Sequence, residues 1–278
     1  MILKEWLRFI YGMAMGTSVP YIKPTNRFMW PTTFKKVDEQ FSLFLGGSCA
    51  CGILHDADNI LLINSNSGKA AVQLQQSIGQ DFKSQKLSIL NTSYRQDFLN
   101  GNQLYSNVSK FVIPNLNESK LLKEWPSKPE NLEKTLEENT FEIAGESVMV
   151  IPVSESASQS DLVVFFKKRR VLFLGALFYN RIHPVLHPHD GMNVQNWIRN
   201  LEALLLRFQP LHIVPAEGEI AEPQALTEFI SYLKSLSDPK VEFLDCRKNF
   251  DWIEIPGQTS LEENFDLLRE NIKSFTKF

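Results

Sequence analysis

The polar loop of residues 91–101 carries the side chains best suited to chemistry. It follows residues 87–90, an apolar run that predicts a buried strand, and it contains Ser93, Arg95 and Asp97. A serine hydroxyl can act as a nucleophile, and a carboxylate can bind a metal ion or accept a proton. A guanidinium is always cationic and only donates hydrogen bonds. Because the loop contains no histidine and Arg95 cannot accept a proton, the loop alone does not predict a nucleophilic site.

A second group of reactive side chains lies within residues 183–190. This segment contains His183, His187, His189 and Asp190. Imidazole and carboxylate groups can bind transition metals, so the segment is a candidate metal site. Two prolines constrain it, however, and its spacing does not place two histidines on one face of a regular element. Loop histidines that lie in solvent are the alternative interpretation.

Five segments of the chain resemble, in order and spacing, sequence blocks of the metallo-β-lactamase superfamily. The loop resembles the block T-H-x-H-x-D-H-x-x-G, of which Thr92, Asp97 and Gly101 are present. The other segments are 61–66 (V-V-I-D-T-G in the family), 157–164 (H-T-x-x-D-L-V-V), 171–184 (V-L-F-x-G-D-L-V-F-N-G-R-H-P) and 214–218 (V-P-G-H-G). The resemblance spans residues 38–238. Its strongest part, 161–218, is similar to the branch related to sulfur-oxidation and quinoprotein-associated hydrolases.

The resemblance implies an α/β fold, namely the four-layer αββα metallo-β-lactamase-like sandwich. We therefore expect residues 38–278 to form this domain and residues 1–37 to form an N-terminal arm packed on it. Strand pairs followed by alternating strands and helices fit such a sandwich, with helices on both outer faces.

The resemblance also identifies seven positions that hold metal ligands in the family. Here these vestigial site positions are Ser93, Arg95, Asp97, Phe98, Ala157, Ala176 and Glu217. Of the family's ligands only the aspartate at Asp97 remains, although Glu217 could offer oxygen in place of histidine. Phe and Ala cannot bind a metal, and a neutral Ser hydroxyl is a poor zinc ligand. The resemblance thus implies that the metal centre is lost, and we assign neither a catalytic residue nor a cofactor.

These substitutions predict a catalytically inactive protein with a binding, scaffolding or regulatory role. Its expected partner is a small molecule or a protein in the former active-site cleft. The alternative is a hydrolase with a relocated or single-metal site, in which one zinc, iron or manganese ion is bound. Its candidate ligands are Asp97, Glu217, His183, His187 and His189. Metal content distinguishes the two hypotheses.

Arg95 leads to a more specific hypothesis about the former site. Buried carboxylates without a cation are costly, and a guanidinium can pair with them bidentately. Arg95, Asp97 and Glu217 could therefore form an internal ion-pair cluster that replaces the metal. The alternative is that Arg95 points into solvent and Asp97 only caps the helical turn that follows it.

Aromatic side chains are expected to line or fill the former cleft. They are Tyr94, Phe98, Phe178 and Tyr179. A third class of function is a subunit of a larger assembly, including a homo-oligomer. In that case residues 28–30, with a Phe, a Met and a Trp, would supply an exposed apolar patch.

Composition gives limits rather than a function. The 278 residues, 43% of them hydrophobic, are enough for one large α/β domain or two small ones, and the net charge of −3 gives no reason to expect nucleic acid as a partner. No apolar run is long enough to span a bilayer. Residues 1–20 only weakly resemble a signal peptide, so we expect a cytoplasmic protein. The three cysteines argue against a disulfide framework, and Cys49 and Cys51 are expected to be small buried hydrophobes.

Periodicity predicts the remaining elements. Helices are expected over 68–78, 194–208, 223–236 and 261–275, because their apolar residues recur at helical spacing. Strands are expected over 41–45, 49–54, 60–63, 87–90, 110–114, 140–143, 147–152, 162–166, 171–174, 211–214 and 241–244. Residues 17–36 are expected to form an extended arm, and the basic run 167–170 is expected to form a hairpin tip in solvent.

Overall fold

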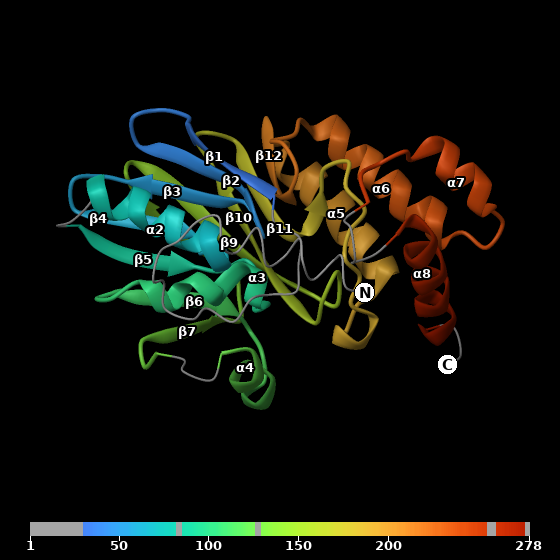
Figure 1. Ribbon diagram of the computed structural model, residues 1–278, viewed down its shortest axis with the longest axis horizontal. Coiled ribbons are helices and arrows are strands. Elements are labelled where there is room, and N and C mark those ends of the chain that lie inside the picture. Colours follow the sequence, from blue (N-terminus) through green and yellow to red (C-terminus); the bar gives the residue numbers. More distant parts are fainter. Residues whose placement is uncertain (1–29, 82–84, 126–128, 255–259, 276–278) are drawn as a thin grey trace, which may run out of the picture.

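Two β-sheets packed face to face form the centre of the molecule (Figure 1). The computed structural model describes residues 30–81, 85–125, 129–254 and 260–275. Helix α2 (Gly68–Asp81) lies against β2 of the first sheet, and helices α5 (Val194–Phe208) and α6 (Pro223–Ser237) contact β11 of the second. The expected four-layer αββα sandwich is therefore confirmed.

The first sheet contains seven strands in sequence order. They are β1 (Trp30–Lys36), β2 (Phe41–Gly47), β3 (Cys51–His55), β4 (Asn59–Ile63), β5 (Lys86–Leu90), β6 (Lys110–Pro114) and β7 (Leu132–Thr135). Strands β1 to β4 pair antiparallel and β4 to β7 pair parallel. Parallel neighbours need crossover connections. These contain α2, then α3 (Gln96–Leu99) with the 3₁₀ turn η1 (Asn100–Leu104), and then α4 (Glu118–Glu124).

The second sheet contains five strands in the order β12-β11-β10-β9-β8. They are β8 (Asn139–Ile143), β9 (Glu146–Ser154), β10 (Ser160–Phe166), β11 (Val171–Tyr179) and β12 (His212–Glu217). Only β11 and β12 pair parallel, and the chain between them contains the 3₁₀ turn η2 (Pro188–Asp190) and α5. Helices α6, α7 (Phe243–Asn249) and α8 (Leu261–Phe275) follow β12. None of the helices in the described residues is both long and apolar enough to cross a membrane.

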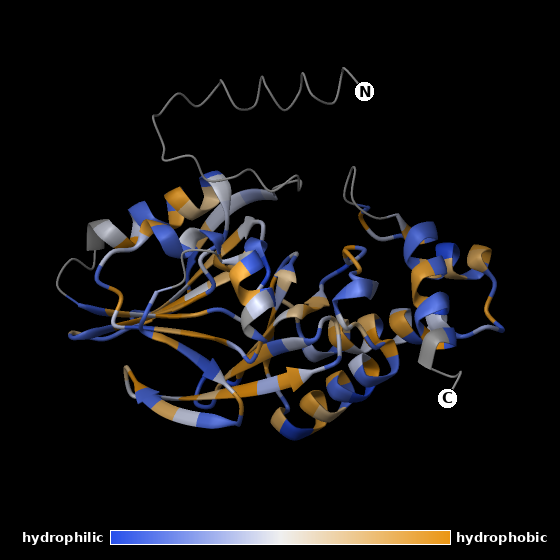
Figure 2. Cartoon of the chain, turned by 90° about the horizontal axis from the view of Figure 1, so that it is seen from below, coloured by the Kyte–Doolittle hydropathy of each residue, from blue (hydrophilic) through white to orange (hydrophobic). Residues whose placement is uncertain are grey.

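The core between the sheets is apolar and close-packed. Every residue of β10 and β11 is buried, because the other sheet covers one face and helices cover the other (Figure 2). The Phe166 ring contacts those of Phe41 and Phe173 at centroid distances of 5.1 and 5.7 Å. Gly52 leaves room for this cluster, since a Cβ atom there would lie 2.6 Å from Cζ of Phe173.

Most predicted elements are confirmed, including the helix 194–208 with both of its ends. The strand expected over 241–244 is wrong, because α7 begins at Phe243. Phe243 packs edge-on against Phe265 of α8, with ring centroids 5.5 Å apart, and this contact favours the helix. Strand β7 was not predicted. The last part of the expected arm is an edge strand, β1, paired with β2, and residues 1–29 lie outside the described residues.

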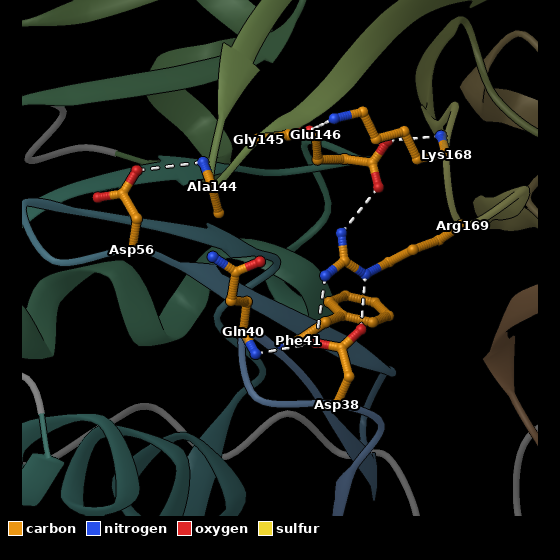
Figure 3. A network of polar contacts seen from close by, with 9 residues as sticks. All are labelled: Asp38, Gln40, Phe41, Asp56, Ala144, Gly145, Glu146, Lys168 and Arg169. Carbon is orange, nitrogen blue, oxygen red and sulfur yellow. Dashed lines mark hydrogen bonds and ion pairs between the residues drawn. The ribbon is translucent and has the colours of Figure 1, made fainter.

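The basic hairpin tip 167–170 is only partly in solvent. Arg169 reaches from the tip to both sheets (Figure 3). Its Nε lies 2.9 Å from Asp38, next to the start of β2, and its Nη1 lies 2.8 Å from Glu146 at the start of β9. Because Glu146 is fully buried, Arg169 neutralises a carboxylate that water cannot reach. The tip therefore joins the two sheets at this end of the sandwich.

Candidate functional site

The loop after β5 is held by side-chain amides from the turn after β4. Asn64 Oδ1 accepts hydrogen bonds from the backbone N–H and the hydroxyl of Thr92, at 2.8 and 2.9 Å. The backbone N–H of Gly101 donates to the Asn66 carbonyl at 2.9 Å, and a Cβ atom on Gly101 would lie 2.1 Å from the Ser65 carbonyl oxygen. Thr92 and Gly101 thus fix the shape of the loop.

The structure brings most of the vestigial site segments together. The Leu162 N–H donates to the Thr92 carbonyl at 2.7 Å, and Ser93 and Asp161 form an isolated antiparallel bridge. Gly175, just before Ala176, approaches Thr92 so closely that a Cβ atom would lie 2.3 Å from its hydroxyl oxygen. Of the seven positions, Asp97 is partly exposed and the other six are buried: Ser93, Arg95, Phe98, Ala157, Ala176 and Glu217.

Arg95 points into the protein, with only 7% of its surface exposed. Its guanidinium carbon lies 5.7 Å from the centre of the Phe98 ring. Burial raises the pKa of the Asp161 carboxyl, and the positive charge of Arg95 opposes that rise. Asp161 Oδ2 also accepts a hydrogen bond from the Ser158 hydroxyl at 2.8 Å. Asp161 is therefore a carboxyl group on which the positive charge of Arg95 acts.

The hypothesis of a cluster of Arg95, Asp97 and Glu217 did not include Asp161. The alternative of an outward-pointing Arg95 is wrong, because the side chain is buried. Sequence reasoning used Asp161 only to align a block. The bridge to Ser93 joins residues far apart in the chain, and no sequence signal indicates it.

Asp97 and Glu217 each accept a hydrogen bond from a different strand or turn. Asp97 lies in the first turn of α3, where a negative charge is favourable, and its backbone carbonyl accepts a hydrogen bond from the Ser48 hydroxyl at 2.7 Å. Glu217, at the end of β12, is buried, and its Oε2 accepts a hydrogen bond from Trp30 Nε1 at 2.8 Å. Trp30 begins β1, so the edge strand reaches the former site. Residues 28 and 29 of the expected apolar patch lie outside the described residues.

The histidines of residues 183–190 do not gather around a common point. His183 is buried against Tyr232 and Trp252, and its Nδ1 lies 3.1 Å from the Tyr232 hydroxyl. Burial lowers the pKa of His183 to about 4, so the ring is neutral at pH 7. His189 is exposed and His187 precedes η2. Within the described ranges, no group of three or more His, Cys, Asp or Glu side chains could hold a metal ion. The zinc centre implied by the resemblance does not fit these residues.

The four aromatic side chains that were expected to line or fill the former cleft are Tyr94, Phe98, Phe178 and Tyr179. Each of them is buried, and the ring of Phe178 meets that of Phe229 on α6 edge-on at 5.4 Å. Burial, followed by the neighbouring Asp190 carboxylate, raises the pKa of Tyr94. All three cysteines are free and buried.

Two hollows lie away from the vestigial site. One, of about 670 Å³, is polar and surrounds the Arg169 contacts, at the other end of β10 from Asp161 (Figure 3). The other, of about 290 Å³, lies between η1, β6 and the end of α4, and Tyr105, Phe111 and Trp125 contribute to its wall. The lining of this second hollow contains no charged side chain.

No protein-family model matches the sequence, and no curated protein matches it. Solved structures do. A metallo-β-lactamase from Pontibacter korlensis has a TM-score of 0.64 at 17% identity, over 73% of this chain and 99% of that one. The DIM-1 metallo-β-lactamase has a TM-score of 0.61 at 19% identity, over 76% and 100%. The sec-alkylsulfatase Pisa1 from Pseudomonas sp. has a TM-score of 0.68 at 10% identity, over 86% of this chain and 50% of that one. These similarities show the fold that the molecules share.

Proposed function

We propose that this chain, which has the metallo-β-lactamase fold, is not a hydrolase and serves a binding, scaffolding or regulatory role. The observation that carries the proposal is the buried Arg95, whose positive charge acts on the buried carboxyl group of Asp161 at the vestigial site. An arginine there repels a divalent cation and supplies the positive charge that the buried acid needs.

The donor set also argues against metal-dependent hydrolysis. Such a site needs about three protein ligands and an open position at which the metal activates water. Ala157 and Ala176 have no donor atoms, and the buried Phe98 ring takes up space at a third position. The chain therefore keeps the loop geometry through Thr92 and Gly101 but lacks the groups that would hold the ion.

The proposed partner is a small molecule or another protein that contacts the region of the former cleft. The burial of the aromatic side chains supports a filled cleft, in which case a protein partner would bind over its rim and a small molecule would need a path inward. We also propose a cytoplasmic location. Three free, buried cysteines fit a reducing compartment.

Elemental mass spectrometry tests the proposal. Untagged protein is incubated with zinc, iron and manganese, desalted, and assayed for bound metal and for lactamase, esterase and thioesterase activity. We expect neither metal nor turnover. About one metal ion per chain, lost on acidification as its ligands protonate, would instead support the single-metal hydrolase. Asp97, Glu217, His187 and His189 would then be the residues to substitute, and D238N on the surface would be the matched control.

A further inference from the structure

Lys120 joins three segments around the vestigial site. It lies in α4, and its ammonium is 5.0 Å from the centre of the Tyr94 ring. The same ammonium donates to Gln159 Oε1 at 3.2 Å and forms an ion pair with Asp190. Tyr94 separates Ser93 from Arg95, Gln159 follows Ser158, and Asp190 ends η2. One side chain thus connects the three loops that surround the former metal position.

The backbone under this contact is firmly held. Leu121, the next residue of α4, is fully buried, and Trp125 packs edge-on against Phe111 at 5.4 Å. The backbone N–H of Gln159 donates to the Asp190 carbonyl at 2.7 Å, which ties the other two loops to each other. The Lys120 side chain is 24% exposed and has four rotatable bonds, so it can move while the helix stays in place.

Several buried polar atoms near Tyr94 could each make a further hydrogen bond. The Ser93 hydroxyl oxygen and Asp161 Oδ1 are buried and have no hydrogen bond of regular geometry, although the Ser93 hydroxyl is close enough to the Asp161 carboxyl to lower its pKa. The Tyr94 hydroxyl belongs to the same region, because Asp190, Ser158 and Asp161 all influence its pKa. Buried polar atoms of this kind accept a small polar molecule or water.

The charges of the region restrict what it could accept. Arg95 and Asp161 already offset one another, so a charged ligand would be buried without a counterion, at a high cost. An uncharged molecule with a hydroxyl or amide group could donate to Asp161 Oδ1 and accept from the Ser93 hydroxyl.

We propose that the Lys120 side chain is a gate that closes the vestigial site to small, uncharged, hydrogen-bonding molecules. In the closed position the ammonium covers Tyr94 and is held by Asp190 and Gln159. Opening breaks one partly exposed ion pair and one hydrogen bond, and leaves α4 in place. The inference rests on the proposed function, because access matters only if the former metal position receives a ligand.

Acetylation of tyrosine by N-acetylimidazole, itself small and uncharged, tests the gate. Labelling of Tyr94 is followed by peptide mass spectrometry in the wild type, K120A, K120R and K234A. Lys234 forms a comparable ion pair with Glu202 at 2.6 Å and serves as the matched control. We expect K120A to label Tyr94 about fivefold faster, the factor that corresponds to the ~1 kcal/mol of one such pair. K120R and K234A should label Tyr94 at the wild-type rate.

Tyr232 distinguishes an open gate from an unfolding protein. It is fully buried in the aromatic cluster beside His183, and it should remain unlabelled in every variant. Unchanged labelling of Tyr94 in K120A, or labelling of Tyr94 and Tyr232 in parallel, would overturn the gate. Bound metal in the same samples would overturn the proposed function instead, so the two failures are separable.

Discussion

The backbones of Ser93 and Asp161 pair in an isolated antiparallel bridge, and this pairing brings the loop after β5 to the first strand residues of β10. Two consequences follow from it. Asp161 becomes a fully buried acid, and the positive charge of Arg95 opposes the rise in its pKa.

Replacing Arg95 by methionine should destabilise the protein strongly. The substitution keeps the volume of the aliphatic stem but leaves the Asp161 carboxylate buried without its cation. Removing one partner of a buried ion pair costs about 3–5 kcal/mol in unfolding free energy. Urea denaturation at pH 7 measures the loss.

Two further variants test whether the lost stability comes from the unpaired carboxylate of Asp161. R207M removes an exposed arginine, whose Nη2 lies 2.6 Å from Glu138, and it should cost less than about 1 kcal/mol. The double variant R95M/D161N should recover much of the stability lost in R95M, because it leaves no unpaired charge. An R95M protein as stable as R207M would show that Arg95 does not compensate Asp161.

The buried His183 should make stability depend on pH. Burial lowers its pKa to about 4 in the folded protein, whereas the unfolded chain has the ordinary value near 6.5. The unfolded state therefore binds the proton first as the pH falls. The contribution of His183 is complete above pH 6.5 and decreases between pH 6.5 and 4, by about 3 kcal/mol in total.

Urea unfolding of the wild type and of H183N between pH 7 and pH 4 isolates this effect. Asn cannot titrate, so H183N should lose less stability than the wild type over that interval, although it starts from a lower value at pH 7. Asp251 and Glu254 are the charged groups that oppose the lowering of the His183 pKa, and both variants retain them. Parallel pH curves for the two proteins would contradict the assignment.

The sequence predicted correctly the helices with a long periodic pattern, and the family blocks with several matching residues predicted the fold. Helix α5 was predicted with both ends, because 15 residues of helical periodicity exclude a strand. It failed at residues 241–244, because a short apolar run fits a helix as well as a strand, and the contact of Phe243 with Phe265 decided the outcome. The five family blocks predicted the fold correctly, although different residues occupy the family's metal-ligand positions within them.

The partners inside the site could not be predicted in the same way. Arg95 was identified as the decisive residue, but its neighbour Asp161 depends on a bridge between distant segments. Lys120 belongs to no motif, and it lies in α4, between β6 and β7. Contacts between single polar residues that are far apart in the chain produce no periodic pattern in the sequence, so such contacts cannot be predicted from it.

Replacing Trp30 by phenylalanine should destabilise the edge strand. The change removes the indole N–H that donates to Glu217 Oε2 at 2.8 Å. Because Glu217 is only 4% exposed, water cannot readily replace this donor, and the expected cost is about 1–3 kcal/mol. Hydrogen exchange should also become faster in β1. E217Q is the matched control, because its amide oxygen can still accept from Trp30, and it should perturb β1 less.

Two glycine-to-alanine substitutions should act in opposite directions. In G52A the new methyl group would lie 2.6 Å from Cζ of the buried Phe173, in the core between the sheets, and the overpacking should cost about 1–3 kcal/mol. In G79A the methyl group meets no atom within 4 Å, and the position lies on the exposed side of α2. Alanine favours a helix over glycine, so G79A should stabilise the protein by about 0.5–1 kcal/mol. Thermal unfolding of the two variants beside the wild type measures both effects. A G52A protein as stable as the wild type would mean that the two sheets can separate locally at Phe173, contrary to the close packing of this core.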